Sequence, residues 1–342
     1  TQVTTPDWLL IVASIAALAW PIVDFESFIY RAADPTPTDV VLGTALIALV
    51  LEATRRTSGA ILPVTAAAFV VYAFYGPLLD LVGLGLIAHR GYDPARIVGT
   101  LYMTLEGIFG VPLDVAATYI VLFTIFGAVL NVSGTGKFLV DWSLAAVGRS
   151  RHGAGAGRAV TAAGLLLGAV SGSGVANTVT LGSMTWPVLK RAGYPSNMAG
   201  AILSAAGIGA LICPPALGAA AFIIAELLKI SYLQVVVMAA IPALLYFLSI
   251  LLMIEADTRR LGTRALDLAL PSAWELTRRQ GFHFLALIGL PIMLALGMSA
   301  FRAVFYSILV AIALSFIDRR TALWPRRLAV ALSAGGKSVI AV

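Results

Sequence analysis

Hydroxyl and amide side chains are concentrated in one short stretch of an otherwise apolar chain, AVSGSGVANTVTLGSM at residues 169–184. Its polar and small residues include Ser171, Gly172, Ser173, Asn177 and Thr180. Neutral side-chain oxygens, together with carbonyl groups freed where a helix is interrupted, suit a monovalent hard cation, chiefly Na⁺. A divalent cation would need several carboxylates, and a proton relay would need a chain of Asp, Glu or His residues.

A second interruption lies at residues 207–215, where two glycines precede the pair Pro214-Pro215. Proline breaks a helix because it lacks the backbone N–H and its ring clashes with the preceding turn. Non-helical backbone survives at membrane depth only where protein or a water-filled cavity covers it. Paired interrupted helices therefore indicate a transporter site. Helix N-termini near Ser173 and Pro215 favour an anionic group on the substrate.

The composition places the chain in the all-α polytopic membrane class. Of its 342 residues, 60% are hydrophobic and 12% are charged, about half the charged share of a soluble domain. The net charge of +6 is carried by short loops between apolar runs, so it indicates orientation in a lipid bilayer rather than binding to nucleic acid. Cys213 is the single cysteine, so no disulfide forms within this sequence.

The apolar runs predict membrane spans that must position these polar stretches. Arg55 and Arg56 follow the second run, so the positive-inside rule places them and the N-terminus in the cytoplasm and the first loop outside. Residues 82–114 mix charged and apolar side chains, which is typical of an amphipathic segment at the outer interface. The predicted spans are 8–23, 40–51, 60–81, 115–130, 232–254, 284–298 and 303–317.

The segment around the Ser/Asn cluster is too short to cross the membrane. Residues 159–170 reach about 18 Å as a helix, against a hydrocarbon core of about 30 Å. Basic residues flank the region at 149–158 and at Lys190-Arg191. We therefore expect a re-entrant hairpin over 159–189, followed by a broken span over 197–228. The same rule places 136–148 flat on the cytoplasmic surface.

Two other classes of protein compete with a transporter. Gly164, Gly168 and Gly172 are four residues apart and favour a helix-packing seam, as in a structural membrane subunit without a site. An intramembrane serine hydrolase would use Ser173 as its nucleophile, but it needs a His or Lys base, and no predicted span core contains a His. A packing seam needs no Asn177 and no clustered hydroxyls, so these favour a site.

The stretch VSGSGVANTVTLGSMTWPVLKRAGYPSNM and its continuation to residue 226 resemble the large membrane subunit of tripartite ATP-independent periplasmic (TRAP) transporters. Residues 51–59 and 105–130 resemble the fused permeases that work with TAXI-type binding proteins. The resemblance implies an elevator-type secondary transporter in the bacterial inner membrane. It implies Na⁺ symport of organic-acid anions delivered by a periplasmic binding protein, with no enzymatic activity and no organic cofactor.

The resemblance also assigns residues and parts of the chain. The substrate would contact Ser171, Gly172, Ser173, Asn177, Thr180 and Pro215. Sodium would contact Ser173, Asn177, Gly207, Gly209 and Pro214. Residues 1–81 would be scaffold helices like those of the small subunit, 82–114 a connector, and 115–342 the first part of the transport subunit. We expect an N-terminal fragment, because the second inverted repeat is missing.

This chain departs from the resemblance at two places. Many members of the family have a glutamate early in 201–206 and a Gln-Met or Gln-Leu pair before Pro-Pro. This sequence has Ile202-Leu203 and Ile212-Cys213 there. These differences predict a subgroup, whose substrate the resemblance does not identify.

Overall fold

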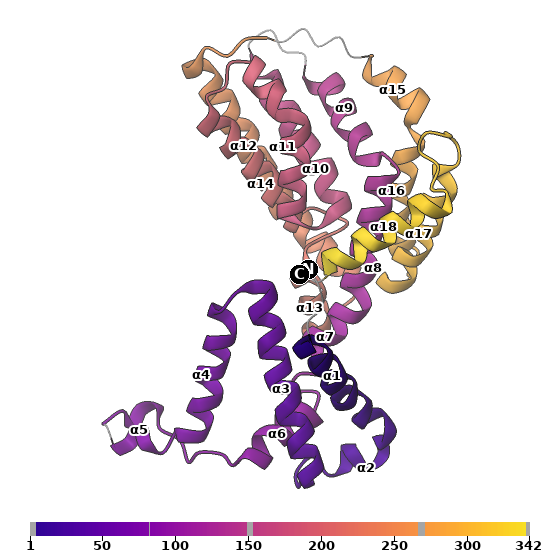
Figure 1. The fold of residues 1–342 in the computed structure, drawn as a ribbon. Coiled ribbons are helices and arrows are strands. Elements are labelled where there is room, and N and C mark those ends of the chain that lie inside the picture. Colours follow the sequence, from indigo (N-terminus) through magenta and orange to yellow (C-terminus); the bar gives the residue numbers. More distant parts are fainter. Residues whose placement is uncertain (1–4, 82, 149–152, 266–270, 340–342) are drawn as a thin grey trace. The chain divides into compact units, whose positions relative to one another are not determined.

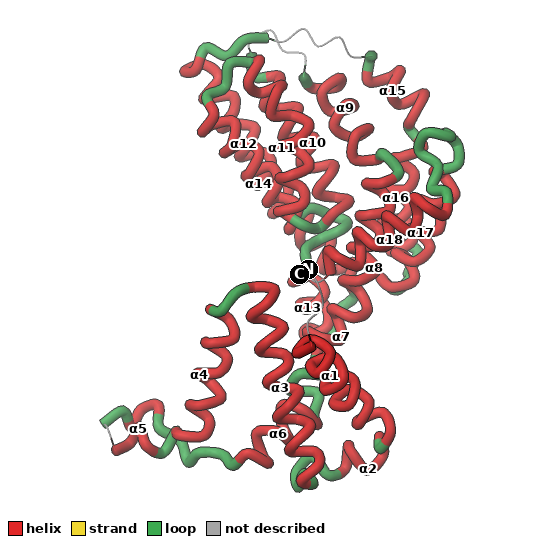
Figure 2. The backbone as a smooth tube through the Cα atoms, in the orientation of Figure 1, coloured by secondary structure: helices red, strands yellow, loops and turns green. Residues whose placement is uncertain are grey.

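The computed structural model describes residues 5–81, 83–148, 153–265 and 271–339, which form helices and no strand (Figure 2). The chain divides between Asp114 and Val115 into two compact units, here called unit 1 and unit 2. In the described ranges, four helical stretches are long and apolar enough to cross a membrane. They are Thr5–Val23, Pro37–Ser58, Val111–Val132 and Tyr232–Arg260. The chain is thus an all-helical polytopic membrane protein, as predicted.

Unit 1 is organised around its longest helix, α3, against which α1, α4 and α6 pack (Figure 1). A small apolar core between these helices contains Phe28, Leu46 and Tyr102. The amphipathic segment predicted before residue 114 includes α6, which buries its apolar face in this core. The helices are α1 (Thr5–Val23), α2 (Phe25–Tyr30), α3 (Pro37–Ser58), α4 (Ile61–Tyr75), α5 (Leu78–Leu81) and α6 (Pro94–Met103).

A buried carboxylate joins three parts of unit 1. Asp39 is fully buried and accepts hydrogen bonds from Trp20 Nε1 at 2.7 Å and Arg31 Nε at 2.6 Å. The backbone N–H and the hydroxyl of Thr36, the N-cap of α3, donate to the same carboxylate at 2.9 and 2.7 Å. A desolvated charge is tolerated only when paired and hydrogen-bonded in this way. Asp39 therefore fixes the start of α3 against α1 and the end of α2.

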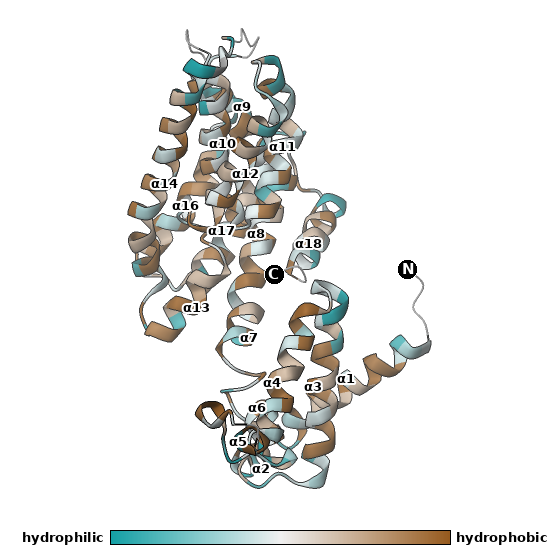
Figure 3. Cartoon of the chain, turned by 90° about the vertical axis from the view of Figure 1, so that its left-hand side faces the viewer, coloured by the Kyte–Doolittle hydropathy of each residue, from teal (hydrophilic) through white to brown (hydrophobic). Residues whose placement is uncertain are grey.

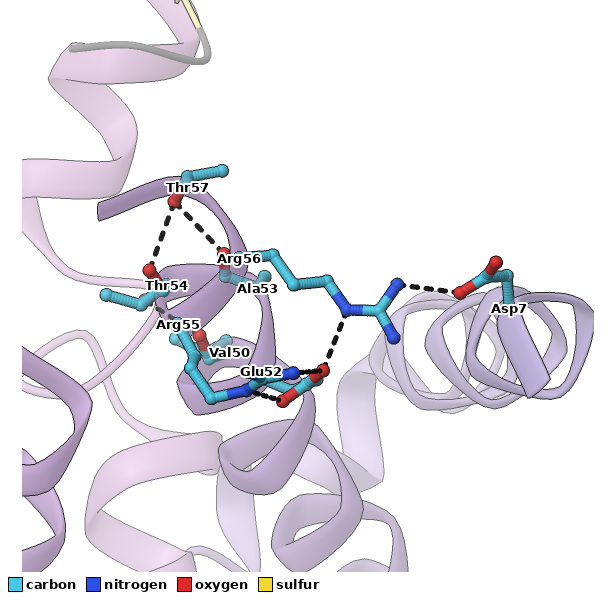
Figure 4. Close-up of polar contacts among 8 residues, drawn as sticks. All are labelled: Asp7, Val50, Glu52, Ala53, Thr54, Arg55, Arg56 and Thr57. Carbon is cyan, nitrogen blue, oxygen red and sulfur yellow. Dashed lines mark hydrogen bonds and ion pairs between the residues drawn. The ribbon is translucent and has the colours of Figure 1, made fainter. Parts of the chain in front are cut away.

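A second ion-pair cluster lies at the other end of α3 (Figure 4). Arg55 and Arg56 each bind Glu52 of the preceding turn at 2.7 Å. Arg56 also reaches Asp7 at the start of α1, at 2.6 Å. Both arginines are about half exposed, so solvent screening keeps each ion pair weak. The cluster ties α1 to α3 through Arg56, one of the two arginines that indicated the membrane orientation.

Unit 2 begins with a continuous helical stretch that contains a π-helical turn, Ala116–Ile120. The stretch bends at Gly134, whose φ is +88°, and α9 follows. In the interrupted helix, residues 212–218 separate α13 from the turn after α12 and form no helix. Helix α7 (Val111–Val115) contains the boundary between the two units. The helices of unit 2 are α8 (Val121–Val132), α9 (Thr135–Val147), α10 (Gly155–Ser171), α11 (Gly174–Arg191), α12 (Ser196–Ile208), α13 (Ala219–Leu228), α14 (Tyr232–Leu261), α15 (Ala273–Gln280), α16 (Phe282–Ala295), α17 (Ala300–Ser315) and α18 (Pro325–Val339).

Helices α10 and α11 lie side by side and are joined by only two residues, Gly172 and Ser173 (Figure 1). This helical hairpin begins four residues before the predicted 159–189 segment and ends two residues after it. It packs against α12 and the 3₁₀ turn Gly209–Leu211. The polar stretch is thus a turn between helices that faces the interrupted helix.

The structure corrects the placement of residues 136–148 as a separate surface helix. Helix α9 packs lengthwise against α10, and Phe138, Leu139 and Leu144 are buried. Lys137 is exposed and pairs with Asp141 at 3.6 Å. Because these residues are four apart, both charges lie on one edge of the helix and leave its other face free to pack. The basic residues at 149–158 suggested a surface helix, whereas the charges of α9 itself occupy only one edge and its other face packs on α10.

Helices α17 and α18 pack against α8, and α16 packs against α14. Helix α18 crosses α8 so closely that a Cβ on Gly335 would lie 2.9 Å from the Cα of Ile125. Arg327 of α18 donates to the carbonyl of Val132, the last residue of α8, at 3.1 Å. A cation suits this position because the last carbonyls of a helix have no partner within the helix. Most of α14 is hydrophobic in Figure 3, in keeping with a membrane span.

Candidate functional site

The tip of the hairpin is a tight turn fixed by its own hydroxyl groups. Ser171 ends α10, and its Oγ accepts from the backbone N–H of Ser173 at 3.4 Å. Ser173 is the N-cap of α11, and its Oγ accepts from the N–H of Ala176 at 3.4 Å. Gly172 between them has φ +58°, a left-handed conformation that favours glycine. A Cβ there would also lie 2.7 Å from the carbonyl oxygen of Ala216.

The glycines of α10 form a close seam with the interrupted helix. A Cβ on Gly164 would lie 2.8 Å from Ala206, and one on Gly168 would lie 2.9 Å from Ala210. Together with Gly172 at the tip, these residues allow the two backbones to approach directly. The packing role predicted for the three glycines is confirmed. The seam also brings the non-helical backbone after Leu211 against the tip.

Asn177 connects this seam across three helices. Its side chain is 2% exposed, and Nδ2 donates to the carbonyl of Gly164 on α10 at 3.1 Å and of Gly207 on α12 at 3.4 Å. Both bonds require the NH₂ group at this position, because carbonyl groups can only accept. The other end of the amide, Oδ1, is buried and has no hydrogen-bond partner among the residues that the structure describes.

An unpaired buried oxygen is unfavourable by about 1–3 kcal/mol unless a donor or a cation satisfies it. Asn177 Oδ1 is therefore the atom of this region that most needs a ligand. Among the described residues, no three His, Cys, Asp or Glu side chains form a group able to hold a metal ion. Neutral oxygens of this kind fit a monovalent cation such as Na⁺.

A small cavity of about 40 Å³ lies beside the tip. One side is formed by Ser171, Gly172 and Ser173, and another by Phe123 of α8 and Phe222 of α13. The two phenylalanine rings contact each other, with centroids 4.7 Å apart. The cavity has room for a water molecule or a bare ion but not for an organic acid.

The structure brings only part of the predicted set together. Ser171, Gly172 and Ser173 meet the interrupted segment at Ala216 and Leu217, and Asn177 meets Gly207. Pro214 and Pro215 belong to the same interrupted segment; their peptide bond is cis, and the carbonyl of Pro215 accepts a hydrogen bond from Tyr232. Gly209 packs against Phe247 of α14, and Thr180 is half-buried and nearly one turn farther along α11 than Asn177.

The aromatic residues around the tip did not stand out in the sequence. Three rings form one cluster of contacts there: Phe123 of α8, Phe222 of α13 and Tyr232 of α14. Each lies in an apolar run, where an aromatic residue is ordinary. The only local signal is the position of Tyr232 directly after Ser231, the N-cap of α14.

The arrangement at Ser173 differs from that of a hydrolase nucleophile. Its hydroxyl caps α11, and in the described ranges it makes no hydrogen bond to a His or Lys side chain. His283 Nδ1 is bonded to the hydroxyl of Thr135 at 2.9 Å, and His89 belongs to unit 1. His152 lies outside the described residues.

Comparisons with known proteins agree with the transporter pattern. The model of the tripartite ATP-independent periplasmic transporter DctM component matches residues 45–342. A TRAP transporter large permease protein of Haemophilus influenzae is 28% identical over 139 residues, 41% of this chain and 31% of that protein. The 2,3-diketo-L-gulonate TRAP transporter large permease protein of Escherichia coli is 32% identical over 111 residues, 32% of this chain and 26% of that protein. These matches span about a third or less of either relative.

Proposed function

This chain belongs to the DctM family, the large permease component of TRAP transporters, and on that premise we propose that it is part of a Na⁺-coupled importer of organic-acid anions. The family works in the membrane with a periplasmic solute-binding protein, which we propose is of the TAXI type here. We place the permease in the bacterial inner membrane with its N-terminus in the cytoplasm.

The single observation that supports sodium coupling is the unpaired oxygen of Asn177. It lies where α10, α11 and α12 meet, and both hydrogens of the same amide already bind helix carbonyls. A Na⁺ ion bound to this oxygen would satisfy it and hold the hairpin against the interrupted helix. Coupling follows if the substrate binds best to that closed arrangement, since the two ligands then raise each other's affinity.

The anionic substrate is supported by the polarity of the tip. Ser173 begins α11, an 18-residue helix whose first N–H groups carry a partial positive charge. The E. coli relative is named for 2,3-diketo-L-gulonate, a sugar acid. The cavity at the tip is far smaller than such a molecule. We therefore propose that the tip contributes only the carboxylate contacts and that further chain completes the site.

Transport by the complete permease tests this function. The permease would be reconstituted in liposomes with its binding protein and a radiolabelled organic acid. We expect an inward Na⁺ gradient to drive accumulation and an equal K⁺ gradient to drive none. Uptake that is equal in Na⁺ and K⁺ would refute sodium coupling. Failure of every organic acid to bind the partner protein in calorimetry would refute the substrate class.

A further inference from the structure

The interrupted segment of unit 2 is held by one side chain of the following helix. Tyr232, in the first turn of α14, donates its phenol hydrogen to the carbonyl of Pro215 at 2.8 Å. The phenol oxygen of Tyr232 also accepts a hydrogen bond from the backbone N–H of Leu217, at 3.2 Å. Both bonds are buried. Tyr232 thus satisfies a donor and an acceptor that the helix break leaves without helical partners.

The ring of Tyr232 is fixed independently of its hydroxyl. It stacks on Phe222 with centroids 4.4 Å apart and an interplanar angle of 5°, and it meets Phe123 edge-on at 5.7 Å. Phe222 also stacks on Tyr119, in the π-helical turn, at 5.4 Å. These rings restrict the motion of the phenol, so its oxygen is held at one point. The two phenylalanines that contact Tyr232 are also the aromatic walls of the tip cavity.

The segment that Tyr232 holds is the one that meets the hairpin tip. Ala216 lies between its two hydrogen-bonded residues, and the carbonyl of Ala216 faces Gly172. Leu217 lines the tip cavity. A backbone without helical hydrogen bonds has many conformations, and few of them direct these groups at the tip. The orientation of Ala216 and Leu217 therefore depends on the hydroxyl of Tyr232.

From this geometry we infer that Tyr232 is a positioning residue for ligand binding, which holds residues 215–217 against the hairpin tip and so keeps the hairpin that carries Asn177 Oδ1 in place for cation binding. The inference rests on the proposed sodium-coupled function and adds to it a residue outside the predicted site. Tyr232 does not touch the ion. It lowers the conformational freedom that binding would otherwise have to remove, so its loss weakens cation binding more than it slows transport at saturation.

The test compares Y232F with Y194F in the complete permease. Y232F removes both hydrogen bonds and keeps the stacked ring. Tyr194 is equally buried, and its hydroxyl bonds Thr258, about 39 Å along α14 from Tyr232. For Y232F we expect the half-saturating Na⁺ concentration of uptake to rise about tenfold, with the maximal rate within about twofold of the parent. Y194F should change neither quantity.

A second measurement reports the opening of the interrupted segment without a transport assay. Cys213 adjoins the Pro-Pro pair and is buried. Its alkylation by N-ethylmaleimide, followed by mass spectrometry of its peptide, reports opening of the segment. Y232F should speed this alkylation about tenfold, and Y194F should not.

The two measurements separate the possible failures. If Y232F matches the parent in both sodium dependence and alkylation, the inference is wrong. An equal loss of maximal rate in Y232F and Y194F would also overturn it, because a general structural effect would then suffice. If the parent itself shows no sodium dependence, the proposed function fails, while alkylation of Y232F still decides whether Tyr232 holds the segment.

Discussion

Asn177 uses both hydrogens of its amide on carbonyl groups of two different helices and leaves its oxygen unpaired. A side chain needed only to join α10 and α12 would have no use for a buried acceptor, which is unfavourable by about 1–3 kcal/mol. Leucine has nearly the same shape and avoids that cost. We therefore propose that Asn177 serves a ligand site rather than a structural subunit, which the sequence left as an alternative.

Replacing Asn177 by leucine tests this reading. We expect N177L to reach the membrane and to lose sodium-dependent uptake at least tenfold, because the cation loses its buried oxygen ligand. T185V is the matched control, since Thr185 lies on the same helix, is fully buried, and bonds only the carbonyl of Leu181 in the preceding turn. Uptake by N177L at the level of T185V would favour the structural subunit instead.

The hairpin is an element whose two ends tolerate substitution differently. Gly172 at the tip and Gly193 after α11 both have positive φ, +58° and +89°. A Cβ on Gly193 would meet nothing within 4 Å, whereas one on Gly172 would strike the carbonyl of Ala216. Both glycines thus allow a left-handed backbone conformation, but only Gly172 also allows close contact between the hairpin tip and the interrupted segment.

Alanine at each position separates these effects. G193A should lower the free energy of unfolding by about 1 kcal/mol, the strain of a left-handed residue. G172A adds a steric clash and should cost about 3 kcal/mol, with loss of most uptake. Thermal unfolding in detergent, followed by size-exclusion chromatography, measures the difference. Equal losses of stability would mean that the tip does not press on the interrupted segment.

Helix α3 begins at a carboxylate that should be costly to neutralise. Asp39 is fully buried and accepts hydrogen bonds from Arg31, Trp20 and the N-cap Thr36. We expect D39N to destabilise the protein by about 3 kcal/mol, because Arg31 then lacks its buried counter-charge. D24N is the control. Asp24 also binds Arg31 but is about one-third exposed, so its replacement should cost less. Equal thermal shifts for the two variants would contradict the role of Asp39.

The sequence predicted these elements unevenly, for physical reasons. The apolar run at 159–170 is short for a membrane span, and glycine with serine at its end favours a turn, so the hairpin could be inferred locally. Helix α9 was misplaced because the sequence does not show that Lys137 and Asp141 occupy one edge while Phe138 and Leu139 pack. The aromatic cluster at Tyr232 depends on contacts between distant helices, which no local pattern reveals.

At the scale of the whole molecule, the charged residues indicate the sidedness of the chain. The cluster around Asp39 lies at the start of α3, and the cluster of Glu52, Arg55 and Arg56 lies at its end. Helix α3 has 22 residues, which is long enough to cross the hydrocarbon core. We therefore expect the two ends of α3 to reach opposite membrane faces. Because cytoplasmic loops carry the excess of arginine, the end at Arg56 should be cytoplasmic and the loop before Asp39 periplasmic.

Cysteine labelling in intact cells measures this sidedness. In a C213S background, cysteine would replace Asp34, exposed in the loop before α3, or Ser58, exposed at its far end. A membrane-impermeant maleimide should label D34C nearly completely and S58C only after the cells are opened, because the reagent cannot cross the bilayer. Both variants should label in detergent, which controls for exposure. Labelling of S58C but not D34C in intact cells would invert the proposed topology and place the N-terminus outside.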